Sequence, residues 1–139
     1  MSDDIKLQVG VKVFLKNSAG KYLLVKRNQD KYKNVAGCWD IIGGRIDPGT
    51  LLIENLRREV YEETKLNISS EPKIIYAQDI LRSGNHVVRI SYSALAEGEP
   101  ILDMAENIEY GWFKLEEIAG IPDVDIYVKE IIEKKLLTQ

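Results

Sequence analysis

Three glutamates in one short stretch, Glu59, Glu62 and Glu63, have the residue type and spacing that most clearly suggest chemistry. A spacing of three and four residues places them on one side of a helix, where like charges repel each other. Glu63 also falls at the edge of the apolar face of that helix, where a carboxylate is costly unless a cation meets it. Hard divalent cations take oxygen ligands, and Mg²⁺ is usually held by a few carboxylates together with substrate phosphate oxygens. The stretch therefore predicts a divalent-cation site beside a phosphorylated substrate.

A solvated helix is the alternative interpretation of the same glutamates. Arg58 can form ion pairs with Glu62 and Glu54 four residues away, each worth a few tenths of a kcal/mol. The loop directly upstream, at residues 43–49, favours a site, because its glycines let backbone groups approach an ion or a phosphate closely.

The elements that must hold these residues follow from the hydrophobic pattern. Alternating apolar residues predict two hairpins. Their strands are expected at 6–16 and 22–26, and at 72–82 and 86–96. A polar loop is expected over 28–36, a short apolar segment over 39–42, an acidic loop over 97–107 and a short strand over 110–114.

Two helices are expected from apolar residues that recur at three and four positions. The first begins after Thr50, a good N-cap residue, and ends near Thr64. The second covers 123–137. Together with the strands, these helices predict a mixed sheet with helices in one domain over residues 1–139.

Composition excludes several classes of protein. The 139 residues carry 19 basic and 22 acidic side chains, a net charge of −3, whereas non-specific nucleic-acid binders usually show a basic surplus. The single cysteine, Cys38, excludes an internal disulfide framework and a multi-cysteine metal site. Residues 1–6 are acidic and polar, unlike a secretory signal, and no apolar run is long enough to span a membrane. We expect a cytoplasmic protein that binds neither nucleic acid nor membrane.

Residues 43–66 resemble the Nudix box, whose pattern is G-x5-E-x7-R-E-U-x-E-E-x-G-U with U an aliphatic residue. The positions that match at the right spacing are Gly44, Arg58, Glu59, Val60, Glu62, Glu63 and Leu66. The similarity extends to Trp39, to the opening hairpin and to residues 106–118, so it covers almost the whole chain.

The resemblance implies a Nudix-type α/β/α sandwich with a mixed β-sheet. It also implies hydrolysis, dependent on Mg²⁺ or on Mn²⁺, of the pyrophosphate linkage of a nucleoside diphosphate joined to another group. The substrate is then a nucleotide-type small molecule, such as a nucleoside triphosphate, an ADP-ribose-like compound, a sugar nucleotide or a dinucleoside polyphosphate. The sequence leaves the oligomeric state open, although homodimers are common on symmetry grounds.

The same resemblance implies which residues form the site. Metal ligands are expected at Glu59, Glu62 and Glu63, with a loop carbonyl from Gly43 or Gly44. Water is a poor nucleophile toward a polyanion, so a general base is needed near it.

The base is expected to be Glu62 or else Glu106, which could equally belong to a solvated loop. Substrate contacts are expected from Arg27 and Arg45, which could meet a phosphate, and from Trp39, which could stack on a base. The alternative for Arg27 and Arg45 is an ordinary surface cation, and the alternative for Trp39 is an aromatic residue of the core.

Thr50 departs from the box, because it stands where the first glutamate is expected. In the family that glutamate is thought to brace the box arginine, here the catalytic-site residue Arg58. Asp47 or Glu54 could take its place.

Lys65 is the second departure and stands where the final glycine is expected. A non-glycine residue costs roughly 1–2 kcal/mol in a left-handed conformation, so we expect a rearranged helix exit in which Asn67 takes the turn. The two departures leave a second hypothesis open, a Nudix-fold nucleotide-binding module with reduced or no turnover.

Overall fold

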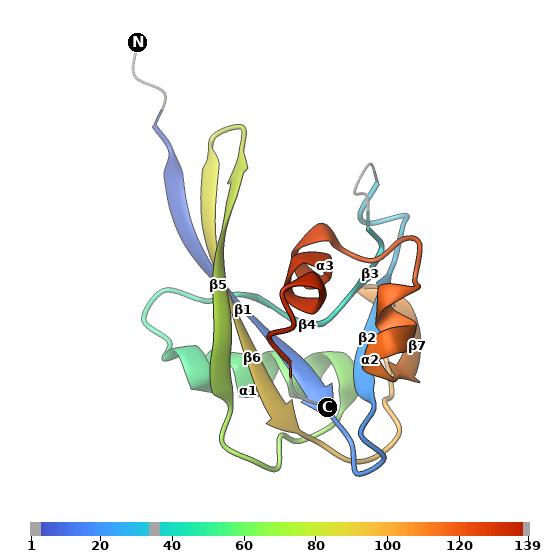
Figure 1. Ribbon diagram of the computed structural model, residues 1–139. Coiled ribbons are helices and arrows are strands. Elements are labelled where there is room, and N and C mark those ends of the chain that lie inside the picture. Colours follow the sequence, from blue (N-terminus) through green and yellow to red (C-terminus); the bar gives the residue numbers. More distant parts are fainter. Residues whose placement is uncertain (1–3, 34–36, 138–139) are drawn as a thin grey trace.

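The computed structural model describes residues 4–33 and 37–137, and it forms one mixed sheet with helices on both faces (Figure 1). Residues 34–36, the end of the predicted polar loop, lie outside the described residues. The strands are β1 (Lys6–Lys16), β2 (Tyr22–Arg27), β3 (Trp39–Asp40), β4 (Ile42–Arg45), β5 (Lys73–Arg82), β6 (Asn85–Leu95) and β7 (Asn107–Phe113). The helices are α1 (Leu52–Thr64), α2 (Leu115–Ala119) and α3 (Ile126–Glu133).

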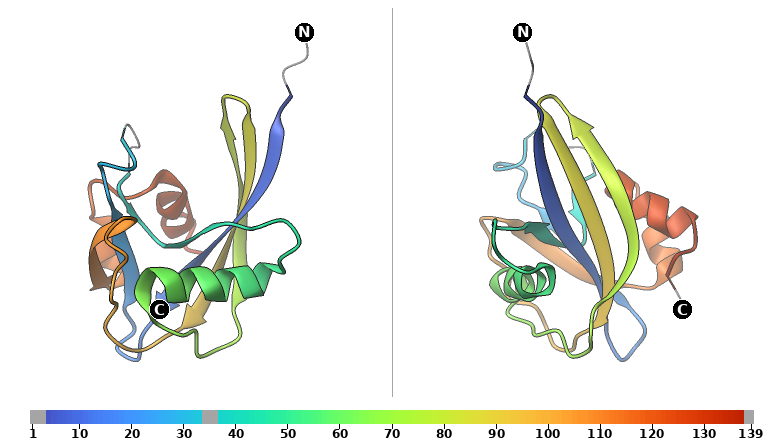
Figure 2. Two further views of the ribbon diagram at one scale, coloured as in Figure 1. Left: turned by 180° about the vertical axis from the view of Figure 1, so that it is seen from behind. Right: turned by 90° about the vertical axis from the view of Figure 1, so that its left-hand side faces the viewer.

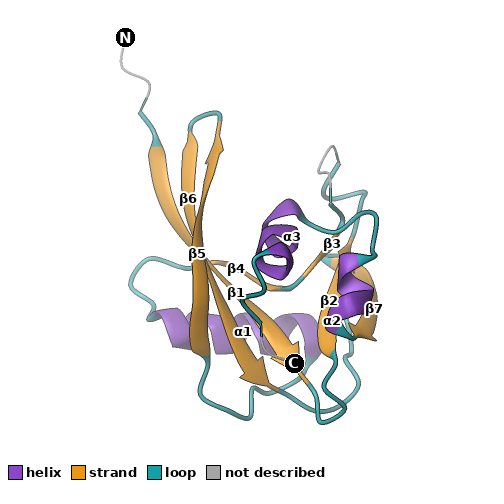
Figure 3. Ribbon diagram, in the orientation of Figure 1, coloured by secondary structure: helices purple, strands orange, loops and turns teal. Residues whose placement is uncertain are grey.

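The described residues form a seven-stranded sheet (Figure 3). Strand β1 pairs with three of the other strands, β2, β4 and β6. Strand β1 runs parallel to β6 along its whole length, and β5 pairs antiparallel with the other side of β6. On its opposite side β1 pairs with β2 at its C-terminal end, where Lys16 lies opposite Tyr22. The earlier part of β1, residues 10–13, pairs antiparallel with β4 on that side. Strands β3 and β7 pair with β2. Because β1 and β2 diverge after one residue pair, the sheet splits, and β4 carries the glycine-rich segment into the split.

Helices cover the two faces of the sheet (Figure 2). Helix α1 packs on one face, and α2 and α3 lie on the other, each over its own apolar core. The first core contains Leu56 and Val60 of α1 against β1, and the second contains Val128 and Ile131 of α3 against Phe14. This arrangement confirms the α/β/α sandwich. In the described part of the chain, no helix combines the length and apolar character needed to cross a membrane.

Both predicted hairpins and the first helix are present, but the helix begins differently. Leu51 is the N-cap residue and makes no side-chain cap bond, while the Thr50 N–H donates to Asp47 O in the preceding turn. The predicted cap at Thr50 is therefore wrong. The helix exit also differs: Lys65 itself adopts the left-handed conformation, with φ 62°, and its N–H donates to Tyr61 O. The expected turn at Asn67 is not needed.

The last helix is shorter than the predicted 123–137, because Asp125 begins it. One carboxylate oxygen of Asp125 accepts the N–H groups of Tyr127 and Val128, which fixes the N-terminus of α3. Residues 115–119 form the additional helix α2, and β7 begins at Asn107, earlier than the predicted 110–114.

Candidate active site

Helix α1 presents the three box glutamates in different environments. Glu62 is exposed, Glu59 is mostly buried with a side-chain exposure of 19%, and Glu63 places its Oε2 out of contact with solvent. Burial, and then the nearby negative charge of Glu59, raises the pKa of Glu63 from 4.5 to about 8. The sequence expectation that Glu63 lies at the edge of the apolar face is met, and the cost of that position is visible in its pKa.

The glycine pair on β4 lets the backbone pass closely over α1 and β1. Gly43 has φ 144°, and a Cβ there would lie 2.0 Å from Val11 O, so only glycine fits. At Gly44 a Cβ would lie 3.1 Å from Glu59 Oε2, which means that the Glu59 carboxylate packs directly against this backbone. The segment therefore brings backbone groups beside the carboxylates, as the glycine spacing predicts.

Arg58 is braced although the expected glutamate is missing. Its guanidinium donates to Asp47 Oδ2, to Asn55 Oδ1 and to Glu62 Oε1, each at 2.9 Å. Asn55 is fully buried and also accepts the Asp47 N–H through its Oδ1 at 3.1 Å, so it ties the loop to the helix. Of the two substitutes predicted from sequence, Asp47 makes the contact.

Glu106 reaches the site from the loop before β7. It accepts hydrogen bonds from Lys31 Nζ and Tyr32 Oη, which come from the loop after β2. Burial alone would raise the pKa of Glu106, but these two donors outweigh burial and lower it. The next residue, Asn107, donates from Nδ2 to Glu63 Oε1 at 3.1 Å. The Glu106 side chain is therefore held by Lys31 and Tyr32 and does not belong to a freely solvated loop.

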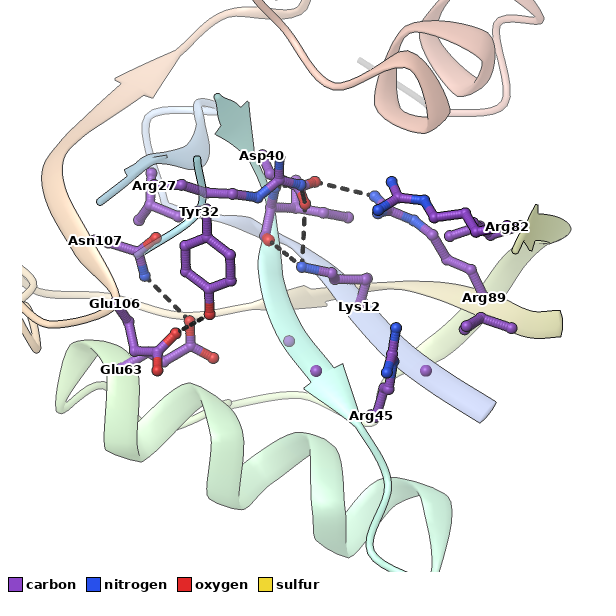
Figure 4. Close-up of a pocket in the computed structure, with 17 residues that line it drawn as sticks. Lys12, Arg27, Tyr32, Asp40, Arg45, Glu63, Arg82, Arg89, Glu106 and Asn107 are labelled. Carbon is purple, nitrogen blue, oxygen red and sulfur yellow. Dashed lines mark hydrogen bonds and ion pairs between the residues drawn. The ribbon is translucent and has the colours of Figure 1, made fainter. Parts of the chain in front are cut away.

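These elements enclose a pocket of about 500 Å³ in the split of the sheet (Figure 4). Glu63, Glu106 and Asn107 line one end of it. Five cationic side chains also line it, namely Lys12, Arg27, Arg45, Arg82 and Arg89. Glu59 and Glu62 are not among the lining residues.

Asp40 lines the pocket and is the centre of a charge network. Its Oδ2 accepts Lys12 Nζ at 3.1 Å and a nitrogen of Arg27, and its Oδ1 accepts Arg89 at 3.0 Å. Asp40 is 1% exposed; burial alone would raise its pKa, but these cations outweigh burial and hold the pKa well below its usual range. Asp125 adds a second acceptor for Arg27 at 3.0 Å. Two carboxylates thus fix three cations around the pocket.

The sequence-predicted substrate residues are placed differently from one another. Arg45 is exposed and lines the pocket, and Arg27 lines it while bound to Asp40 and Asp125. Trp39 does not line the pocket: it packs edge-to-face on Phe113, with ring centroids 5.7 Å apart, in the second core. The core alternative predicted for this tryptophan therefore describes its environment.

Several functional candidates were missed by sequence reasoning, above all Lys12, Asp40, Arg82, Arg89 and Asn107. A signal for some of them was present. Lys12 and Arg89 are charged residues in the middle of strands whose neighbours are apolar, and Asp40 interrupts the apolar segment 39–42. A charge in such a position needs a partner, so these three could have been paired.

The carboxylates of Glu59, Glu62 and Glu63 are of the ligand type that a divalent cation prefers, although their side chains do not point to one common position in this structure. Among residues 4–33 and 37–137, no three His, Cys, Asp or Glu side chains gather in a metal-binding arrangement. The fit comes from Glu63, whose buried Oε2 accepts no hydrogen bond from a donor group of the described chain, and from the neighbouring Glu59, whose carboxylate packs on the Gly44 backbone. A hard cation would supply the missing positive charge at this position.

Comparison with known proteins identifies the family. Residues 6–134 match the model of the NUDIX domain. The chain belongs to the NUDIX family. Among solved structures, the MutT protein from Methanosarcina mazei Go1 is 27% identical with a TM-score of 0.82, covering 94% of this chain and 93% of that one. The MutT NUDIX hydrolase from Burkholderia pseudomallei is 25% identical with a TM-score of 0.77, covering 95% and 99%.

A curated relative in Bacillus subtilis (strain 168) bears the name "Putative 8-oxo-dGTP diphosphatase". It is 32% identical over 104 residues, which make up 74% of this chain. The matched part spans 64% of the length of that relative.

Proposed function

We propose that the protein is a divalent-cation-dependent pyrophosphohydrolase acting on a nucleoside diphosphate joined to another group. The observation that carries this proposal is the unpartnered buried oxygen of Glu63 at one end of a pocket lined by cations. The carboxylate needs a positive partner, and arginine and lysine side chains suit phosphate oxygens. The name of the Bacillus relative supports a nucleoside triphosphate as the first substrate to test.

The box glutamates and the glycine segment form the proposed metal site. Glu59 and Glu63, with Glu62 and a carbonyl of Gly43 or Gly44, would hold Mg²⁺, which supplies neutralisation of phosphate oxygens and a lower pKa for a bound water. Asn107 orients the Glu63 carboxylate through its 3.1 Å hydrogen bond.

The cations at the pocket wall act on the substrate. Arg45 carries no ion pair with any described residue and is free to meet a phosphate. Arg27 and Lys12 are held by Asp40, so their remaining donors point from fixed positions. Fixed donors need no reorganisation as charge develops on the phosphate oxygens, which is the basis of electrostatic catalysis.

Two carboxylates are candidates for the base that accepts the proton of the attacking water. Glu106 lines the pocket, where Lys31 and Tyr32 hold it. Glu62 is exposed on α1 and paired with Arg58. Replacing each by glutamine separates them, because loss of the base lowers kcat and flattens its acidic pH limb, whereas loss of a positioning contact leaves that limb in place.

The test is a nucleotide panel with Mg²⁺ or with EDTA, in which released phosphate and pyrophosphate are measured. We expect turnover of at least one nucleotide with Mg²⁺ only, and a loss of two or more orders of magnitude in Glu63→Gln. Glu54→Gln is the matched control, because Glu54 is an exposed glutamate in the first turn of the same helix. Binding of nucleotides without turnover by any of them would replace the enzyme with the binding module.

A further inference from the structure

The end of the pocket away from Glu63 has an unusual composition of hydrogen-bonding groups. Its cationic side chains are Arg82 and Arg89, which donate and never accept, and the Asp40 carboxylate that lines the pocket beside Arg89 has both oxygens occupied (Figure 4). No carboxylate of the described residues forms an ion pair with Arg45 or Arg82. This end of the pocket is called the donor subsite below.

Strand register explains how the donor subsite is assembled. Gly10 of β1 is directly opposite Arg45 of β4 on one side and Arg89 of β6 on the other. A Cβ at Gly10 would make only ordinary contacts, the nearest being Val87 Cγ1 at 3.6 Å. The missing side chain therefore leaves an open floor between two arginines. Val87 and its cross-strand partner Ile80 extend this floor as an apolar surface.

Arg89 pairs with Asp40 and Asp125 through its terminal nitrogens but leaves its Nε without an acceptor in the described part of the chain. It is 4% exposed and lines the pocket, yet its Nε–H has no partner among the described residues. The carboxylate beside it, Asp40, is already saturated. Its Oδ1 accepts Arg89 and the Ile41 N–H, and its Oδ2 accepts Lys12 and Arg27. An unsatisfied buried donor is costly, so a ligand that brings acceptors is favoured here.

We propose that the donor subsite selects nucleobases whose ring edge carries oxo groups over bases with amino groups. The apolar floor at Gly10, Val87 and Ile80 accepts a flat ring, and Arg82 and Arg89 donate to carbonyl oxygens on its edge. An exocyclic amino group would set its own N–H against these donors and leave both unpaired. The inference rests on the proposed function, because it takes the pyrophosphate to lie at the Glu63 end.

The test uses substrate pairs that exchange an oxo group and the neighbouring ring N–H for an amino group and an unprotonated ring nitrogen, ITP with ATP and UTP with CTP. We expect kcat/KM to favour the oxo member of each pair by about tenfold or more, since sites that hydrogen-bond one group reject its replacement strongly. In Arg82→Gln, whose amide both donates and accepts, the preference should fall below about threefold, through KM more than kcat. The matched control is Lys73→Gln, an exposed cation at the other end of the same strand, which should keep the wild-type preference.

A binding measurement separates this inference from the proposed function. Calorimetry of IMP and AMP in EDTA should show tighter binding of IMP to the wild type and equal binding to Arg82→Gln. Turnover with equal kcat/KM within both pairs overturns the base preference while leaving the hydrolase. Tighter IMP binding without turnover of any nucleotide supports the preference and overturns the hydrolase. If an added 3′-phosphate on an adenine nucleotide tightens binding and the base does not matter, the donor subsite is a second anion site and the base preference is overturned. If neither binding nor turnover is found, both proposals are overturned.

Discussion

Replacing Glu63 by glutamine should stabilise the metal-free protein, and the gain should depend on pH. Burial and the neighbouring Glu59 raise the pKa of Glu63 to about 8, against 4.5 for an ordinary glutamate. Between these values the unfolded chain releases a proton that the folded chain keeps. The contribution of Glu63 therefore lowers the free energy of unfolding of the wild type progressively as pH rises from 4.5 to 8, and this contribution is constant above pH 8.

The magnitude follows from this interval. At about 1.4 kcal/mol per pH unit, the full interval sets an upper limit of about 5 kcal/mol. Relaxation and water entry reduce the cost of buried charges well below idealised values, so we expect a gain of about 2 kcal/mol at pH 8.5. Glutamine keeps the acceptor for Asn107 Nδ2, which leaves the charge as the main change. At pH 4.5 the two proteins should be nearly equal in stability.

The assay is urea unfolding in EDTA at pH 4.5, 6.5 and 8.5, with Glu62→Gln as the matched control. Glu62 is exposed and forms only a surface ion pair with Arg58, so its loss should change stability by less than about 1 kcal/mol at every pH. A gain from Glu63→Gln that is the same at all three pH values would refute the role assigned to burial, and so would a net loss at pH 8.5.

Four further outcomes follow from the same contacts. Millimolar Mg²⁺ should raise the thermal midpoint of the wild type, as any ligand of the native state does, and raise that of Glu63→Gln much less; equal shifts in calorimetric scans would contradict the ligand assignment. Asp47→Asn should lower kcat about tenfold, because Arg58 loses the carboxylate that ties it to the preceding loop and keeps its ion pair with Glu62 on the helix, while changing stability by less than about 1 kcal/mol in urea melts. Asp40→Asn should cost about 3–5 kcal/mol at pH 7 by leaving buried cations without their anion; this cost should shrink as pH falls below the ordinary aspartate pKa, and an equal cost at pH 3 would count against the network. Gly10→Ala should leave the melting curve within about 1 kcal/mol of wild type but raise KM several-fold in steady-state assays, because the added methyl group meets only ordinary contacts and occupies the pocket floor.

The sequence alone determined the local features of this protein. Period-two patterns located the hairpins, and the spacing of Glu59, Glu62 and Glu63 located a charged edge on a helix. These features are readable because side chains three or four positions apart on a helix, or two apart on a strand, share a face whatever the rest of the chain does. The resemblance of residues 43–66 to a known box extended this to the fold and to a reaction class.

Helix boundaries show where local patterns are insufficient. Thr50 is a residue type that favours the cap position, yet the Asp47 turn holds its backbone, Leu51 is the N-cap and the helix begins at Leu52. Lys65 takes the left-handed position that its type disfavours, since the following residues pack into the core and the chain must turn there. At Thr50 a neighbouring turn, and at Lys65 core packing, outweighs a residue preference of about 1 kcal/mol.

Only the tertiary structure decided what surrounds the pocket. Asp40 meets Arg89 across 49 residues and Arg27 meets Asp125 across 98. The parallel pairing of β1 with β6 and the split between β1 and β2 bring these residues together. Register between strands distant in sequence depends on how the whole apolar set is buried at once, so no single segment encodes it. Local periodicity therefore locates the carboxylates of the site, whereas strand pairing locates its cations and, with them, the proposed choice of base.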